Sequence, residues 1–251
     1  MKININLIFY NAQTNFGDQL SPFILDMLVN KEKHTVSYNA PGDGVSIVMI
    51  GSYIHEARNA SYIYGSGVRS DPPVEHYRNY SNLNICAIRG PITKAFLEGR
   101  GFTVPEIFGD PALLLPLFYK PIVIPGLSNK IAVIPHKSNY NKYKYIEKDS
   151  KYLLINPLDH WKNVINKLFS CKYIISSSLH GLICSDAYSK PNVWLDEFSL
   201  SEGDTKFKDY FMSQSREYVK IKKLEEFDEA KLYSEGNKVD LEKLRNAFPF
   251  R

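Results

Sequence analysis

The stretch that most restricts the fold is residues 173–188, YIISSSLHGLICSDAY. A short strand, 173–175, gives way to three serines, and Leu179, His180 and Gly181 then open a helix of small residues. Where a buried strand changes into a helix in this way, backbone N–H groups converge at the carboxyl end of the strand and the helix dipole favours an anion. The stretch therefore predicts a pocket with His180 at its mouth. Histidine can transfer a proton near neutral pH, although a half-buried histidine bonded to a serine or a carbonyl is the simpler interpretation.

The same alternation of strand and helix recurs along the chain. Residues 45–50 form a continuous apolar run, which is typical of a strand buried on both faces of a parallel sheet. Residues 20–28 have the apolar spacing of one helix face, with Asp18 or Ser21 as the candidate N-cap. Further strands are expected at 3–9, 62–64, 83–88, 131–134, 153–155 and 193–195, and further helices from Pro91, at 159–169 and at 182–188. This order predicts an α/β fold with parallel sheets.

Prolines interrupt the pattern between the two series of strands. Pro116, Pro121 and Pro125 lie close together and are followed by a glycine, as is typical of a linker. We therefore expect two domains, at residues 1–120 and 127–251, with a cleft between them. Beyond residue 205 the charges are balanced, a polar connector is expected at 225–237, and a last amphipathic helix follows it.

Composition excludes several classes of protein. Apolar residues make up 44% of the 251 residues, and nowhere is there a run of about 18 consecutive apolar residues that could span a membrane. The net charge of +4 is too small to indicate nucleic-acid binding. Cys86, Cys171 and Cys184 lack metal or redox spacing, so we expect no metal, no cofactor and a reducing, cytoplasmic environment. The N-terminal residues predict a first strand and not a signal peptide.

Polar residues and glycines collect at the predicted carboxyl ends of the strands, where ligands of open parallel sheets bind. They include hydroxyl groups, two arginines, a lysine and two histidines, a mixture that suits a small, phosphate-bearing substrate with several negative charges. The residues are Asn15, Gly17, Asp18, Ser52, Gly65, Ser66, Gly67, Arg69, Arg89, Gly90, Asp110, His136, Lys137 and residues 176–180.

Two aspartates of this set have a simpler interpretation. Asp18 either orients substrate hydroxyl groups or caps a helix, and the sequence slightly favours the cap. Asp110 stands in a Gly-Asp-Pro sequence, which favours a turn over a catalytic role. The glycines around Ser66 do not make a complete dinucleotide or P-loop motif.

Six short motifs resemble, in the same order, those of the polysaccharide pyruvyl transferase family. The motifs are Asn15-Phe16-Gly17-Asp18, Ile50-Gly51-Ser52, Tyr64-Gly65-Ser66-Gly67, Arg89-Gly90-Pro91, Gly109-Asp110-Pro111 and Ser177-Ser178-Leu179-His180-Gly181, and the similarity extends over about residues 10–196. The resemblance implies two Rossmann-like domains that face a central cleft, as in GT-B glycosyltransferases. It also implies a bacterial enzyme of capsule or exopolysaccharide synthesis. Its donor would be phosphoenolpyruvate, and the product a pyruvate ketal on a hexose that is either free or linked to undecaprenyl diphosphate.

The resemblance further implies roles for individual residues. His180 matches the family's catalytic histidine, and Arg89 matches an arginine that binds phosphate, with a structural ion pair at the domain interface as its alternative. Where the family often has arginine before Leu-His, this chain has Ser178, and Arg69, His136 or Lys137 could supply the missing charge. The expected site is thus catalytic His180, Arg89 and Asp18, with substrate-binding residues Asn15, Ser66, Gly67, Arg69, His136, Lys137, Ser178, Leu179 and Gly181.

Two other functions fit the same outline. A nucleotide-sugar glycosyltransferase would need a carboxylate in the C-terminal domain to hold a ribose, and Asp186 or Glu197 could serve. A sugar-binding subunit without catalytic activity is the second, because a fold does not fix a function. The basic, tyrosine-rich stretch at 136–145 permits peripheral contact with an anionic membrane that carries the acceptor, and a mobile, solvated loop is its alternative.

Overall fold

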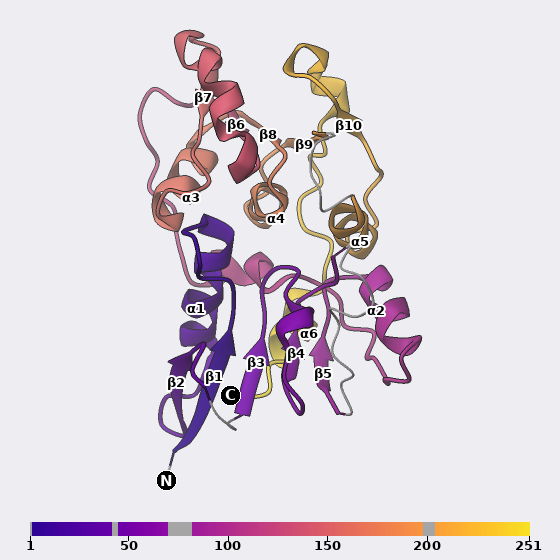
Figure 1. Cartoon of the computed structure of the whole chain (residues 1–251). Coiled ribbons are helices and arrows are strands. Elements are labelled where there is room, and N and C mark those ends of the chain that lie inside the picture. The colour runs from indigo at the N-terminus through magenta and orange to yellow at the C-terminus, as the bar shows by residue number, and fades with distance from the viewer. Residues whose placement is uncertain (1, 42–44, 70–81, 198–203) are drawn as a thin grey trace.

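The first lobe of the molecule is built on a parallel sheet. The computed structural model describes residues 2–41, 45–69, 82–197 and 204–251. Five parallel strands lie in the order β2-β1-β3-β4-β5 (Figure 1). They are β1 (Ile3–Ile8), β2 (His34–Tyr38), β3 (Val45–Val48), β4 (Tyr62–Tyr64) and β5 (Asn84–Ala87). Consecutive residues Ile47 and Val48 of β3 are both fully buried, so this strand is covered on both faces, as its apolar run predicts.

Helix α1 (Phe16–Leu28) begins earlier than the sequence predicts. Asn15 caps it, because its Oδ1 accepts a hydrogen bond from the Gly17 N–H (3.1 Å). The predicted caps, Asp18 and Ser21, are therefore wrong, and both residues lie inside the helix. The other helical segments of this lobe are η1 (Ile54–Glu56), α2 (Pro91–Glu98), which starts at Pro91 as expected, and the 3-10 helix η3 (Pro111–Leu117).

The second lobe repeats the arrangement with five parallel strands in the order β10-β9-β8-β6-β7. The strands are β6 (Ile131–Ile134), β7 (Tyr152–Leu154), β8 (Tyr173–Ser176), β9 (Asn192–Leu195) and β10 (Lys220–Ile221). The helices are η4 (Lys137–Lys148), α3 (Trp161–Ser170), α4 (Leu179–Ala187), α5 (Thr205–Ser213), η5 (Leu224–Glu226) and η6 (Glu229–Lys231). In the described part of the chain, no helix is long and apolar enough to cross a membrane.

Several elements differ from expectation. The sequence predicts none of β2, α5 and β10, which are an edge strand, a helix of mixed polarity and a strand of two residues. The stretch at 136–145 is the start of the 3-10 helix η4, which His136 caps by accepting from the Ser138 N–H. It is therefore a regular element with a fixed first turn.

The two lobes confirm the predicted class, a two-domain α/β fold with Rossmann-like halves and the GT-B-like outline (Figure 1). Residues that follow β1, β3, β6 and β8 line one cavity, so the carboxyl ends of strands from both sheets meet between the lobes.

The predicted second domain, residues 127–251, is too long. Helix α6 (Leu241–Asn246) returns to the first lobe (Figure 1). There the Tyr64 hydroxyl donates to the Leu244 carbonyl of α6 (2.9 Å). The ring of Phe250 packs against Tyr62 at 4.8 Å between centroids. These aromatic contacts complete the core of the first sheet, which the sequence pattern of the last helix alone does not indicate.

Candidate active site

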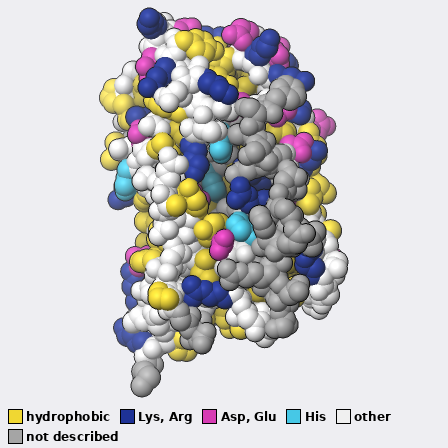
Figure 2. All heavy atoms as spheres, viewed as in Figure 1, with side chains coloured by type: hydrophobic (Ala, Val, Ile, Leu, Met, Phe, Trp, Pro, Cys, Tyr) yellow, Lys and Arg dark blue, Asp and Glu magenta, His cyan; other side chains and the backbone are white. Residues whose placement is uncertain are grey.

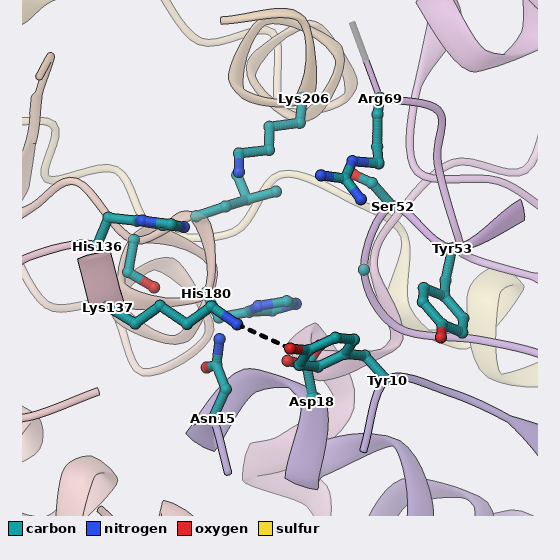
Figure 3. Close-up of a pocket in the computed structure, with 13 residues that line it drawn as sticks. Tyr10, Asn15, Asp18, Ser52, Tyr53, Arg69, His136, Lys137, His180 and Lys206 are labelled. Carbon is teal, nitrogen blue, oxygen red and sulfur yellow. Dashed lines mark hydrogen bonds between the residues drawn. The ribbon is translucent and has the colours of Figure 1, made fainter. Parts of the chain in front are cut away.

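A cavity of about 260 Å3 lies between the lobes. Histidine, lysine and arginine side chains gather at the hollow in Figure 2, and Figure 3 shows the residues around the cavity. The first lobe contributes Tyr10, Asn15, Asp18, Gly51, Ser52, Tyr53 and Arg69, and the second contributes His136, Lys137, Ser178, Leu179, His180 and Lys206. The structure brings together here the following residues of the set predicted from the sequence: Asn15, Asp18, Ser52, Arg69, His136, Lys137, Ser178, Leu179 and His180.

His180 lies in the first turn of α4, and its side chain is 11% exposed. Its ring packs on α1 of the other lobe so closely that a Cβ on Gly17 would lie 2.1 Å from His180 Nδ1. Phe16 meets the ring edge to face, with centroids 6.4 Å apart. The absence of a side chain at Gly17 therefore leaves room for the His180 ring, so the Asn15–Asp18 motif at the start of α1 helps to position the histidine.

Asp110 lies next to His180, on the buried side of the imidazole ring. Its Oδ2 lies 3.7 Å from His180 Nε2, and its Oδ1 accepts from the Ala112 N–H (2.9 Å) and so caps η3. The carboxylate is fully buried, and Nε2 makes no hydrogen bond to any described residue. Catalytic contacts are often long before substrate binds. The turn role predicted for Asp110 is thus accompanied by a second one, since a carboxylate here orients the ring and stabilises positive charge that develops on it.

Among the described residues, three lysine and arginine side chains reach the cavity. Arg69 comes from the first lobe, and Lys137 and Lys206 come from the second (Figure 3). Lys137 Nζ donates to the Tyr10 hydroxyl (3.3 Å) and lies 4.4 Å from the centre of that ring. Lys206, in α5, is only 7% exposed. The sequence does not point to Lys206, because nothing in its helix marks a strand end.

Asp18 supplies a carboxylate to the cavity from the first lobe. It is the third residue of α1, and a Cβ on Gly51 would lie 3.8 Å from its Oδ1 and 4.0 Å from His180 Cε1. The carboxylate and the imidazole therefore approach the same part of the cavity. The aromatic rings of Tyr10 and Tyr53, 6.4 Å apart, stand on the same side, and neither was predicted.

Arg89 does not reach the cavity, in contrast to its predicted contact with phosphate. It is fully buried, and its Nε donates to Asp209 Oδ2 (2.9 Å), so the alternative of an ion pair between the lobes is the one observed. Its other nitrogens donate to the Val68 carbonyl (2.7 Å) and to Ser52 Oγ (2.5 Å). Arg89 acts on the cavity only through Ser52, which lines it.

Three other predicted binding residues have packing roles instead. Ser66 Oγ is buried and donates to the Gly51 carbonyl (2.9 Å). Gly67 makes room for the Arg89 guanidinium, since a Cβ there would lie 2.3 Å from Arg89 Cζ. Gly181 does the same for Ser176, whose Oγ would be 2.1 Å from such a Cβ. These residues shape the loops around the cavity without lining it.

The two carboxylates proposed for ribose binding differ in their surroundings. Asp186 is fully buried and accepts from Tyr210 Oη (2.7 Å), from Asn192 Nδ2 (2.6 Å) and from Arg216 Nη1 (3.2 Å), so it is not open to a ligand. Burial raises its pKa, against the effect of the Arg216 charge. Glu197 accepts from the Ser177 hydroxyl and does not line the cavity.

A comparison with known proteins finds one matching family model. A family model described as Polysaccharide pyruvyl transferase matches residues 7–197. A viral protein, "Uncharacterized protein L143" of Acanthamoeba polyphaga mimivirus, is 26% identical over 213 residues, which are 82% of this chain and 73% of that protein. Among solved structures, E. coli heptosyltransferase WaaC with ADP-2-deoxy-2-fluoro heptose is similar over 80% of this chain and 91% of its own, with a TM-score of 0.36 and 9% identity. That likeness is too distant to add to the topology described above. The family match ends before Lys206.

Proposed function

The chain belongs to the polysaccharide pyruvyl transferase family, and from this premise we propose that it transfers the pyruvyl group of phosphoenolpyruvate to a sugar. The product is a cyclic pyruvate ketal, and inorganic phosphate is released. The observation that carries the proposal is that His180, backed by Asp110, stands in one cavity with Arg69, Lys137 and Lys206.

The charge and size of the cavity suit this donor. Phosphoenolpyruvate carries a phosphate and a carboxylate on three carbons. The described residues that line the cavity include Arg69, Lys137 and Lys206 as cations, against Asp18 as the one carboxylate. Arginine can grip a phosphate through two parallel hydrogen bonds, and each lysine adds a point charge. Pockets for larger ligands run from about 300 to 1,000 Å3, and this one, at about 260 Å3, is smaller. A cavity of this volume suits a compact, three-carbon donor.

His180 is proposed as the proton donor. Protonation of the methylene carbon of phosphoenolpyruvate leaves positive charge on the neighbouring carbon, and a sugar hydroxyl oxygen adds there. The bond from that carbon to the phosphate oxygen breaks, and a second hydroxyl closes the ketal. Of the two hydroxyl protons, one returns to His180 and the other leaves with the phosphate. Asp110 stabilises the imidazolium at each stage at which the ring holds the proton.

The acceptor is proposed to bind on the side of the first lobe. Asp18 can accept hydrogen bonds from sugar hydroxyls, and Tyr10 and Tyr53 offer aromatic rings against which a hexose packs. We further propose that the acceptor is a polysaccharide or its lipid-linked precursor, met at the cytoplasmic membrane surface. Helix η4 supports this, because its exposed Lys142, Lys144 and Tyr145 lie in the element that begins at the cavity.

Ligand binding and turnover test the proposal together. We expect phosphoenolpyruvate to raise the melting temperature of the wild-type protein, and UDP, GDP and CMP not to do so. His180→Gln keeps the packing on Gly17, so it should still bind the donor but release no phosphate from a mixture of donor and hexose acceptors. Stabilisation by one nucleotide alone would instead indicate a glycosyltransferase. Binding of sugar without turnover of any donor would indicate a subunit that is not catalytic.

A further inference from the structure

Helix α5, which carries Lys206 into the cavity, is held to the first lobe by a buried carboxylate. Asp209 is fully buried, and its Oδ2 accepts from Arg89 Nε (2.9 Å) and from Thr93 Oγ1 (2.7 Å). Its Oδ1 accepts from the Thr93 N–H (3.0 Å). The backbones are in close contact at the same point, because a Cβ on Gly90 would lie 2.0 Å from the Asp209 carbonyl oxygen.

The next residue of α5 binds the second lobe. The Tyr210 hydroxyl donates to Asp186 Oδ2 (2.7 Å) in α4, the helix of His180, and Asp186 also pairs with Arg216 (3.2 Å). Two consecutive buried side chains therefore attach α5 to opposite lobes. The helix cannot rotate or slide without breaking one of these contacts.

The anchors lie on the part of the helix that presents Lys206. Asp209 and Tyr210 are three and four residues beyond Lys206, the spacings that place side chains on one face of a helix. At the other end of the ion pair, Arg89 donates to Ser52, which lines the same cavity as Lys206. One buried pair thus connects two groups of the cavity wall, one from each lobe.

We propose that Arg89 and Asp209 are positioning residues whose ion pair sets the Lys206 ammonium group in the anion site of the cavity. Neither touches the substrate, since both side chains are fully buried. The identity of the anion, phosphoenolpyruvate, rests on the proposed function, whereas the placement of Lys206 does not. If Asp209 acts only through Lys206, then substituting Asp209 should have no effect on donor binding in a variant that already lacks the Lys206 ammonium group.

A double-mutant cycle tests the coupling. We expect Lys206→Met and Asp209→Asn each to weaken phosphoenolpyruvate binding by about tenfold, the effect of one lost charged hydrogen bond. The double variant should bind no more weakly than Lys206→Met alone. Lys208→Met is the matched control, because Lys208 lies on the exposed side of α5 (side chain 45% exposed), pairs with Asp204 and should leave the affinity unchanged. Additive losses in the double variant would overturn the proposal.

A second measurement needs no donor. The rate at which an N-hydroxysuccinimide ester acetylates Lys206, relative to Lys208, can be followed by peptide mass spectrometry. We expect Asp209→Asn to raise this ratio severalfold, and an unchanged ratio would overturn the inference. A raised ratio in a protein that binds no phosphoenolpyruvate would leave the positioning role in place and reject the proposed donor. Should Asp209→Asn not fold, Thr93→Val removes one hydrogen bond from Asp209, keeps the ion pair, and should shift the ratio in the same direction by less.

Discussion

The substitution Gly17→Ala probes the contact that seats the catalytic histidine. A methyl group at this position would stand 2.1 Å from His180 Nδ1 and 2.4 Å from Cγ. Ordinary van der Waals contact begins near 3.4 Å, so the ring must withdraw by about 1.3 Å or α1 must move away from α4.

The effect should fall on catalysis more than on folding. Alanine is favoured over glycine inside a helix by about 1 kcal/mol, whereas an extra methyl group in a packed site costs about 1–3 kcal/mol, so the free energy of unfolding should fall by at most about 2 kcal/mol. A displacement of about 1 Å at a reacting group can lower the rate about 100-fold. The three atoms nearest to a Cβ at Gly17 all belong to His180, so we expect the affinity for phosphoenolpyruvate to stay within about threefold of wild type, a change under 1 kcal/mol.

Three measurements on the same preparation check this reasoning. They are steady-state phosphate release, the dissociation constant of phosphoenolpyruvate and the urea denaturation midpoint. Gly99→Ala is the control, because Gly99 has helical backbone angles, its nearest contact would be 3.3 Å, and it lies outside the residues that line the cavity. A folded Gly17→Ala variant with the turnover of wild type would refute the idea that His180 must occupy its observed position.

Two further predictions concern buried groups outside the reaction. Asp186→Asn leaves Arg216 buried without its carboxylate, so urea denaturation should show a loss of about 3–5 kcal/mol; the exposed Asp26→Asn, as control, should lose about 1 kcal/mol at most. Burial raises the pKa of Cys86 and of Cys171 to about 11. At pH 8 about one thiol in a thousand is then ionised, against about one in four at an ordinary pKa of 8.5. Reaction of the native protein with a thiol reagent should therefore be slow at pH 8 and about tenfold faster per pH unit up to pH 10, and fast reaction at pH 8 would contradict these pKa values.

Much of the sheet architecture was predictable, because buried parallel strands leave a strong local signal. The run at 45–50 and the strand before Ser176 are apolar and stop at serine or glycine, and both end at the cavity. The edge strand β2, with the sequence HTVSY, carries polar residues on its exposed side, and so it lacks that signal. Helix α5 is missed for a related reason, since its buried face includes Lys206 and Asp209, which look like surface residues in sequence.

The site was predictable only in its local parts. Strand ends indicate that Asn15, Asp18, His136 and His180 lie close together, and the structure brings them to one cavity. The sequence cannot show which arginine or lysine faces inward, because that depends on partners far along the chain. Arg89 pairs with Asp209, which is 120 residues away in the sequence. The Arg89 guanidinium therefore does not reach the cavity, although its motif predicted a contact with phosphate there.

The return of the last residues to the first sheet affects how the chain can fold during synthesis. Phe250 packs on Tyr62, and α6 covers Tyr64, so the first lobe cannot finish its core when its own strands are complete. At about 5–20 residues per second, the ribosome needs roughly ten to forty seconds to add the residues between Tyr64 and Phe250. During that interval the contacts of Phe250 and α6 with the two tyrosines cannot form, so these rings stay accessible to water and to chaperones. The first lobe therefore completes its core only after the second lobe has been synthesised.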